Sequence, residues 1–335
     1  MSQAGTAAKP NLVSRIGTSG AYQRLLGFSG LLVLIVAFSL ASPNFLQTAN
    51  FINILQAAAV NGVLAVAATV VIISGGIDLS VGTLMTFCSV IAGVLMTYWG
   101  LPMYVGLPGA LIAGLVGGMF SGIFIARLKI PPFIATLGMM LIYKGLAQGI
   151  CQSRPIYFTD TPGFSTIATG SLIGVFVPAV PIPNSVLILF IVAGLVAFVL
   201  GRTALGRYTF AMGSNEEALR LSGVSVDRWK IAIYALAGCV CGVAGIILAS
   251  RINSAQPSIG QGYELNAIAA VVIGGTSLSG GRGTMLGTII GALIISVVAD
   301  GLVILSVPQE WQTVVTGSII IVAVYMDILR RRAIA

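Results

Sequence analysis

The chain has 335 residues, of which 57% are hydrophobic and only 8% are charged. A soluble domain carries about 25% charged residues, so this chain cannot cover itself with a polar surface and is expected to be an integral membrane protein. The net charge of +8 would suggest a nucleic-acid partner only if the basic residues formed a patch, whereas they are scattered between apolar runs.

Residues 1 to about 25 are polar and are predicted to form a cytoplasmic N-terminal tail, followed by one transmembrane domain over 26–335. The first apolar run could be a cleaved signal, but the long leader and the many later spans favour a retained helix. About ten runs approach the length that a bilayer requires. The expected spans are 25–41, 51–73, 79–98, 103–126, 132–150, 184–201, 230–250, 263–278, 284–305 and 309–327. Closely spaced glycines in several of them predict tight helix packing.

The basic residues set the predicted orientation. With the amino terminus inside, all of the 17 lysines and arginines except Lys144, Arg154 and Arg251 fall on the inner side. Both termini and the segment 202–229 are therefore expected in the cytoplasm, and the proline-rich loop 151–183 outside. Arg154 and Arg251 are interpreted as exposed outer cations, which are either ordinary solvated surface or a docking site for an external solute-binding protein.

Polar residues recur within the second apolar run. Asn50, Asn53, Ala57 and Asn61 share a helical face with Gln56 beside it. Two interpretations stay open: hydrogen bonds between helices, or a translocation path through Asn53, Gln56 and Asn61 for a polyhydroxylated solute.

Charged residues near the spans are few. Asp78 is expected either to cap the next helix through amide groups near Ser80 or to belong to a cytoplasmic coupling surface. Lys144 and Asp300 are expected to extend toward the outer membrane surface. No ionisable pair is apparent at the midplane, so the energy for transport is expected to come from another protein.

The segment 202–229 contains a short predicted helix. Ser214 or Asn215 can cap it, and Glu216 and Glu217 then face the positive end of the helix dipole. Arg220 can pair with Glu216 four residues earlier, while Gly223 can adopt the left-handed conformation that ends the helix. About two turns are marginal alone in water, so a partner protein is predicted to bind here. The predicted contact residues are Ser214, Asn215, Glu216, Glu217, Ala218, Arg220, Leu221 and Gly223.

One internal sequence similarity occurs between 71–80 and 271–279, where each predicted span ends in a Gly-Gly pair at the cytoplasmic side. Duplicated halves are common in transporters, although a match this short could also be a coincidence between two helix ends.

No catalytic or cofactor site is expected. The chain has no histidine, its four cysteines lack metal-ligand spacing, and no GxxxxGK[ST] phosphate loop occurs. We therefore expect a pore-forming chain that is not an enzyme.

The sequence resembles the permease subunit of ribose-type ABC sugar importers over nearly the whole chain after residue 31. The stretches that carry the resemblance are 53–56, 74–82, 206–208, 213–218, 220–224, 254–257, 262–265 and 267–278. The resemblance implies a ten-helix fold of the cobalamin-importer (type II) kind in a bacterial inner membrane. It also implies a second permease copy, a periplasmic sugar-binding protein and a cytoplasmic ATPase that uses ATP and Mg.

The resemblance further implies that the helix over 216–223 is the coupling helix seated in the ATPase. The family's glutamate-alanine element matches Glu217-Ala218, and its glycine matches Gly223. The resemblance does not select between ribose, other pentoses, hexoses and cyclitols. The alternative is an ion-coupled secondary sugar carrier.

Overall fold

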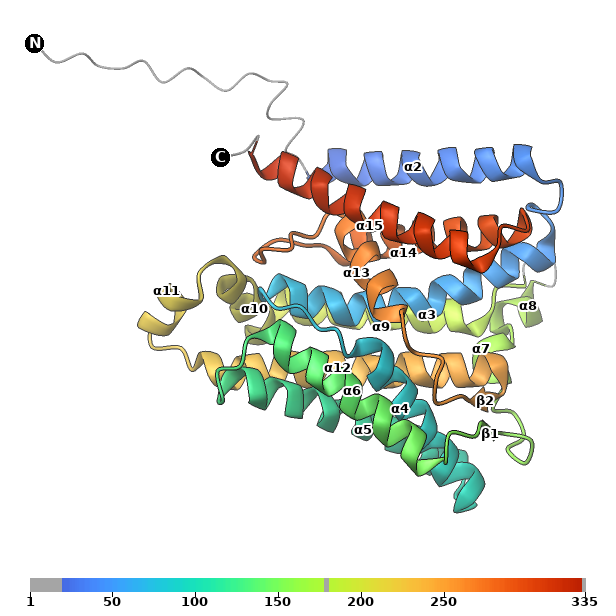
Figure 1. Cartoon of the computed structure of the whole chain (residues 1–335), viewed down its shortest axis with the longest axis horizontal. Coiled ribbons are helices and arrows are strands. Elements are labelled where there is room, and N and C mark those ends of the chain that lie inside the picture. The colour runs from blue at the N-terminus through green and yellow to red at the C-terminus, as the bar shows by residue number, and fades with distance from the viewer. Residues whose placement is uncertain (1–19, 178–180, 333–335) are drawn as a thin grey trace, which may run out of the picture.

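The computed structural model describes residues 20–177 and 181–332, and nearly all of its regular structure is helical (Figure 1). The predicted N-terminal tail lies outside the described residues apart from 20–25, which form the start of the first helix. The long helices are α2 (Gly20–Ala41), α3 (Thr48–Ile73), α4 (Val81–Gly93) with its π-helical extension η1 (Val94–Tyr98), α5 (Met103–Ala126), α6 (Pro132–Ile150), α9 (Asn184–Arg202), α12 (Val226–Ile252), α14 (Met285–Ile304) and α15 (Gln309–Arg332). The shorter elements are β1 (Ile156–Tyr157), α7 (Thr166–Thr169), α8 (Leu172–Phe176), α10 (Ala204–Ser214), α11 (Glu216–Leu221), β2 (Ser254–Ala255) and α13 (Tyr263–Ile273).

Among the described residues, seven helical segments are long and apolar enough to cross a membrane: α3, α4 with η1, α5, α6, α9, α12 and α14. This confirms an all-helical, multi-pass membrane protein. The helix ends agree with the predicted spans within about five residues. The predicted span 263–278 is only an 11-residue helix, α13, because its chain breaks at a glycine-rich turn.

Helix α3 occupies the centre of the bundle. In its most apolar stretch 94% of the residues are buried, and it packs against α9, α12, α13 and α14. A helix that is apolar on all sides is expected to be surrounded by protein or lipid. Here the surrounding elements are mostly other helices, so α3 forms the core on which they are arranged.

Helices α5 and α12 form a glycine-lined antiparallel seam. A methyl group added at Gly118 would overlap the carbonyl oxygen of Tyr234, and one added at Gly114 would overlap the carbonyl oxygen of Gly238. Such close backbone approach is available only to small residues. The predicted tight packing is therefore confirmed for this pair.

The two similar segments, 71–80 and 271–279, fold into the same kind of turn. The backbone N–H of Gly76 donates to Val71 O, and that of Thr276 donates to Val271 O, each at 3.1 Å. Gly75 and Gly275 both have φ of +86°, which is the left-handed conformation of a Schellman helix end. The turns lie close together, since Gly281 N donates to Ile73 O at 2.8 Å.

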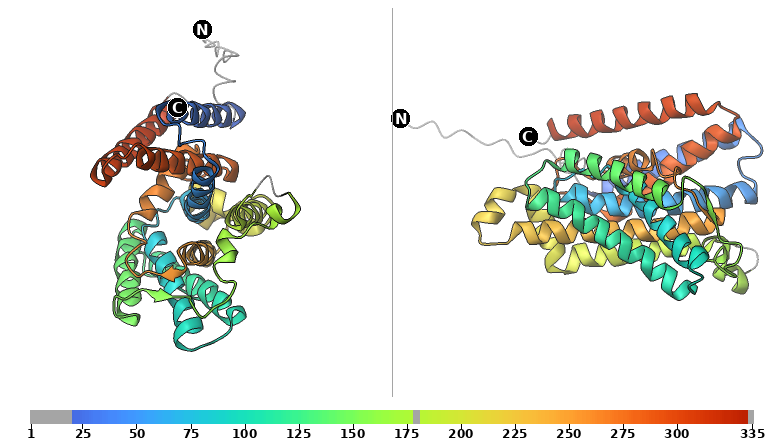
Figure 2. Two further views of the ribbon diagram at one scale, coloured as in Figure 1. Left: turned by 90° about the vertical axis from the view of Figure 1, so that its right-hand side faces the viewer. Right: turned by 60° about the horizontal axis from the view of Figure 1, so that its bottom comes forward.

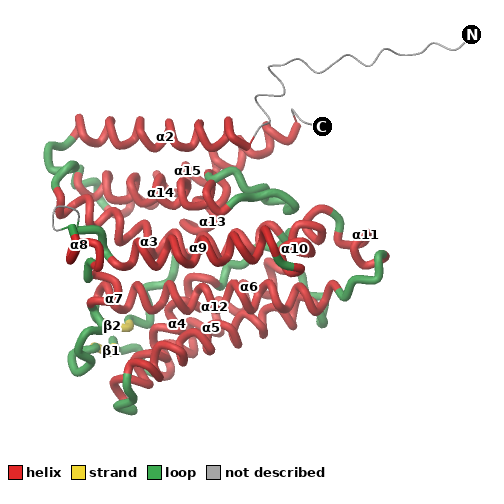
Figure 3. The backbone as a smooth tube through the Cα atoms, turned by 180° about the vertical axis from the view of Figure 1, so that it is seen from behind, coloured by secondary structure: helices red, strands yellow, loops and turns green. Residues whose placement is uncertain are grey.

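The loops gather at the two ends of the bundle, with α10 and α11 at one end and β1, β2, α7 and α8 at the other (Figure 3). The strands pair antiparallel, with Ile156 opposite Ala255 and Tyr157 opposite Ser254. The predicted outer loop 151–183 therefore packs at the end opposite α11. Helix α2 begins and α15 ends on the same side of the bundle as α11 (Figure 1).

Candidate functional site

Helix α11 projects from one end of the bundle and has the predicted local signals. The side chain of Asn215 caps it, because its Oδ1 accepts from Ala218 N at 2.9 Å. Ser214, the other predicted cap, instead donates its hydroxyl to Phe210 O at 2.9 Å within α10. Gly223 ends the segment with φ of +80°, as predicted.

Four ion pairs form a network around α11, and they are all the ion pairs within the part of the chain that the structure describes. Glu216 accepts from Lys230 Nζ at 2.7 Å and from Arg220 Nη2 at 3.4 Å. Asp227 accepts from Arg220 Nη2 at 3.2 Å and from Lys129 Nζ at 2.8 Å. The network therefore joins α11 to the first turns of α12 and to the loop between α5 and α6.

The members of this network differ in burial. The Lys230 side chain is only 14% exposed, whereas those of the other four residues are 35–57% exposed. Exposed ion pairs contribute about 0–1 kcal/mol each, so the pair between Lys230 and Glu216 is expected to be the strongest of the set. The local pair of Glu216 and Arg220 was predicted. The anchoring roles of Lys129 and Lys230 were missed, because only the folded chain brings them beside α11.

The outer surface of α11 has no packing partner in this chain. None of its residues is buried, and the side chain of Leu221 is 83% exposed. Glu217 and Ala218 are exposed as well. Ion pairs hold Glu216 and Arg220 at the base of the helix. The exposed surface that faces away from the bundle consists of Glu217, Ala218 and Leu221.

The helix before α11 seats it on the core. Gly213, near the end of α10, lies so close to Ile73 O and Gly281 N that an added methyl group would overlap both. These two atoms belong to the paired Gly-Gly turn region. The end of α10 therefore packs directly against the end of α3 and the loop that follows α13.

The polar residues of α3 have different environments. Asn53 is exposed, Gln56 is buried, and Asn61 Nδ2 donates to Ser296 Oγ of α14 at 3.2 Å. The Asn61 contact confirms the first interpretation, a hydrogen bond between helices. The translocation path through Asn53, Gln56 and Asn61 stays a prediction.

Asp78 is buried and caps the helix that follows it. Its Oδ1 accepts from Ser80 N at 2.8 Å and from Ser80 Oγ at 2.6 Å. The capping interpretation is confirmed, and burial removes Asp78 from any exposed coupling surface.

The two predicted outer cations lie at the end opposite α11, each just before one of the paired strands. Arg154 is exposed. Arg251 is half-buried and interacts electrostatically with Tyr263 and Asp300, so the expectation of a freely exposed side chain is wrong for Arg251. Docking of a binding protein at Arg154 and Arg251 stays a prediction.

Comparison with known proteins identifies relatives over nearly the full chain. Residues 50–324 match the family model described as branched-chain amino acid transport system / permease component. The ribose import permease protein RbsC of Bacillus subtilis is 42% identical over 93% of this chain and 95% of its own length. The ribose import permease protein RbsC of Escherichia coli K12 is 42% identical, with 89% and 91% covered.

A relative named for a different sugar is less similar in sequence. The xylose transport system permease protein XylH of Escherichia coli K12 is 34% identical over 86% of this chain and 87% of its own length. No solved structure matches the chain.

Proposed function

The chain belongs to the branched-chain amino acid transport system / permease component family, and we propose that it is the membrane-spanning subunit of an ATP-driven, binding-protein-dependent importer of a monosaccharide. The observation that carries the proposal is the 42% identity to ribose import permeases over nearly the whole length of both chains. An ion-coupled secondary carrier is not favoured, because these relatives cover the chain from end to end.

Ribose is the first candidate substrate. The xylose permease is less similar at 34% identity, and the family description names amino acids rather than sugars. Other pentoses, hexoses and cyclitols are therefore the comparison substrates for any assay.

The proposed architecture has ten spans in the type II arrangement. The seven apolar segments are supplemented by α2, α13 and α15, whose positions in the bundle support this count (Figure 1). We place the α11 end in the cytoplasm of a bacterial cell, with the protein in the inner membrane and both termini inside, because the basic residues concentrate on that side. A second copy of the chain completes the assembly.

The proposed mechanism is alternating access. A cytoplasmic ATPase binds ATP and Mg, closes, and moves the two α11 helices seated in it. The contact of Gly213 with the paired Gly-Gly turns transmits that movement to α3 and α13. The two permeases then rock to open outward, receive sugar from the binding protein, and reset after hydrolysis.

Reconstitution in proteoliposomes tests the function. Labelled ribose and xylose are followed with and without the ATPase, the binding protein and ATP. We expect uphill uptake of ribose only when all components are present. Uptake without ATP would replace the proposal with a secondary carrier, and no flux with any partner would indicate a receptor or scaffold.

Two substitutions test the role of α11. Glu217→Ala removes an exposed carboxylate, and Gly223→Ala strains the left-handed residue that ends the segment. Both are expected to uncouple transport from ATP hydrolysis or to prevent binding of the ATPase. Glu310→Ala, which removes an exposed carboxylate at the start of α15 at the other end of the bundle, is the control. Co-purification and stimulated ATPase activity at the unmutated level would refute the assignment.

A further inference from the structure

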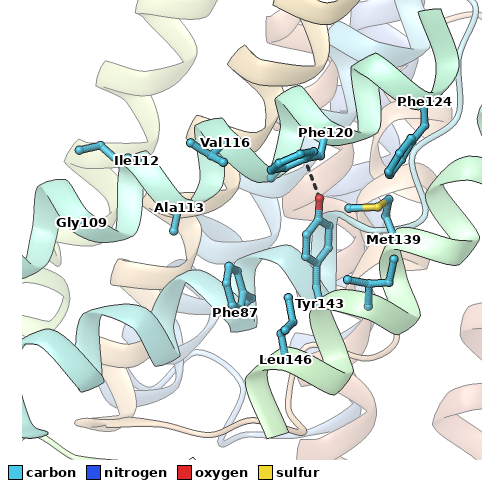
Figure 4. A pocket seen from close by; sticks show the side chains of 12 residues that line it. Phe87, Gly109, Ile112, Ala113, Val116, Phe120, Phe124, Met139, Tyr143 and Leu146 are labelled. Carbon is cyan, nitrogen blue, oxygen red and sulfur yellow. Dashed lines mark hydrogen bonds between the residues drawn. The ribbon is translucent and has the colours of Figure 1, made fainter. Parts of the chain in front are cut away.

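Helix α6 has two faces of opposite chemistry at the same depth. One face closes an apolar groove of about 510 Å³ between α4, α5 and α6 (Figure 4). The Tyr143 hydroxyl in this groove donates to Gly117 O at 2.8 Å, so its polar atom is satisfied by protein. Leu146 lines the groove and is 46% exposed. This face suits lipid chains.

The other face carries polar side chains that contact the loop 253–262. Lys144 Nζ donates to Gln261 Oε1 at 3.1 Å, and Gln148 Nε2 approaches Ser258 Oγ at 3.4 Å. Ser258 and Gln261 are exposed. The expected extension of Lys144 toward the membrane surface is therefore replaced by a contact with this loop.

The loop 253–262 enters the bundle from the β1–β2 end. Gly260 lies against Gly82 and Thr86 of α4, where an added methyl group would overlap both residues. Those residues precede Tyr98, the end of η1, by roughly 18–24 Å along the helix at 1.5 Å per residue. Lys144 lies about 9 Å along α6 from Ile150 by the same measure. Both the loop and Lys144 are therefore within the thickness of the hydrocarbon core, about 30 Å.

This position is incompatible with lipid. Exposed non-helical backbone does not occur in the hydrocarbon region unless it is buried in protein or lines a water-filled space, and charged side chains within spans face such spaces as well. A notch of about 10 Å³ between α4, α6 and the loop leaves room for about one water molecule. Its lining is Thr83, Thr86, Lys144, Pro257, Ser258, Gly260 and Gln261.

A second copy of the chain can enclose this surface. Helices α6, α13 and α15 lie along one side of the bundle (Figure 2, left). On α6, a methyl group added at Gly138, Gly145 or Gly149 would meet no atom within 4 Å. Small residues on an open helix face allow another helix to approach closely in a membrane. A partner seated there would leave Lys144 and Gln148 beside the shared interface.

We propose that Lys144, Gln148, Ser258 and Gln261 form one wall of a water-filled passage for sugar, completed by the same residues of a second copy. The proposal rests on the proposed function and names the part of the chain that sugar contacts. The ammonium, amide and hydroxyl groups can exchange hydrogen bonds with the hydroxyls of a neutral sugar. Several weak contacts of this kind allow a solute both to enter and to leave.

Thiol labelling tests the passage without relying on transport. Lys144→Cys, Ser258→Cys and Gln261→Cys are compared with Leu146→Cys, which lies two residues from Lys144 on the apolar face of α6. The full transporter is kept in its membrane and treated with a charged methanethiosulfonate, which reacts with the thiolate form. The unmutated chain controls for its own cysteines, of which three are buried and Cys239 is partly exposed.

We expect the three wall thiols to react at least about tenfold faster than Cys at 146, because thiolate forms in water rather than in lipid. Added ribose is expected to slow their labelling. Equal rates at all four positions, or no labelling at 144, 258 and 261, would overturn the passage. Labelling with no ATP-driven uptake would support the passage and refute the proposed function. ATP-driven uptake without labelling would support the proposed function and refute the passage.

A transport variant gives an independent readout. Gln261→Leu keeps the size of an exposed side chain but removes its amide. We expect ribose uptake to fall several-fold while binding of the ATPase stays unchanged. Leu265→Ala, which alters an exposed residue one turn into α13, is the control. Equal uptake by the unmutated chain and both variants would contradict a role for Gln261.

Discussion

The seam between α5 and α12 and the helix α11 are stabilised in opposite ways. In the seam, glycines bring two backbones into contact and leave no space for a methyl group. In α11 no residue is buried, and ion pairs hold the helix at its base. The seam is fixed by shape and cannot yield without separating two helices, whereas α11 is held by charges that can exchange partners. If an ATPase moves this permease as proposed, the rigid seam would move as one body and the exposed α11 would be its contact with the ATPase.

The largest effect is expected in the seam. Gly118→Val would place a side chain onto the carbonyl oxygen of Tyr234, and neither backbone can move aside. Overpacking costs about 1–3 kcal/mol where side chains can adjust, so a backbone clash is expected to exceed that range. The yield of monodisperse protein in detergent measures the effect. Gly194→Val on α9, where the added carbon meets nothing within 4 Å, is the control, and equal yields would show that the seam is adaptable.

The next effect is expected where the two regions meet. Gly213→Ala would press a methyl group onto the backbone atoms Ile73 O and Gly281 N, but the single added carbon is smaller than the Val side chain at Gly118 and is expected to be less disruptive. We expect the protein to fold but to lose the fixed position of α10 on the Gly-Gly turns. Thermal unfolding and ATP-coupled uptake should both decrease. Gly201→Ala, at an open position near the end of α9, should change neither, and a similar loss in both variants would contradict a specific junction.

The spans could be predicted because a membrane leaves the backbone few choices. Each crossing must satisfy its own hydrogen bonds, so apolar length and terminal Gly or Pro residues were sufficient for α3, α5, α6 and α14. The same reasoning failed at α13. The predicted span 263–278 begins where α13 begins, but the helix ends at Ile273, because the Gly-Gly pair that follows forms a turn in which Gly275 has a positive φ.

In the candidate site, the local contacts could be predicted from the sequence, whereas the long-range contacts could not. The Asn215 cap, the Glu216–Arg220 pair and the Gly223 terminus each depend on residues within one or two turns, and all were predicted. The contacts of Lys230, Lys129 and Lys144 depend on segments up to 117 residues apart, for which a single sequence gives no signal.

A smaller effect is expected when the attachment of α11 is weakened. Lys230→Met removes the least exposed partner of Glu216, with an expected loss of about 1 kcal/mol. That energy corresponds to a roughly fivefold change in a local opening equilibrium. Hydrogen exchange of the α11 amides is expected to accelerate by this factor, with little change in global unfolding. Arg228→Met, an exposed cation two residues away, is the control, and unchanged exchange in Lys230→Met would show that α11 is not held by this pair.

The smallest effect on the isolated permease, and the sharpest contrast with the seam, is expected from Leu221→Ala. The Leu221 side chain is 83% exposed, so its removal should change the free energy of unfolding by less than about 0.5 kcal/mol. If a cytoplasmic ATPase binds α11, the same leucine becomes buried in the complex, and its loss should weaken binding by more than about 1 kcal/mol. Titration of the ATPase against the permease in nanodiscs measures this difference. Leu172→Ala on α8, where the leucine is 62% exposed at the opposite end, should leave binding unchanged. Equal affinities for both variants would mean that α11 is exposed but is not the binding site of the ATPase. Removing the most exposed apolar side chain of a true binding surface is expected to lower the affinity.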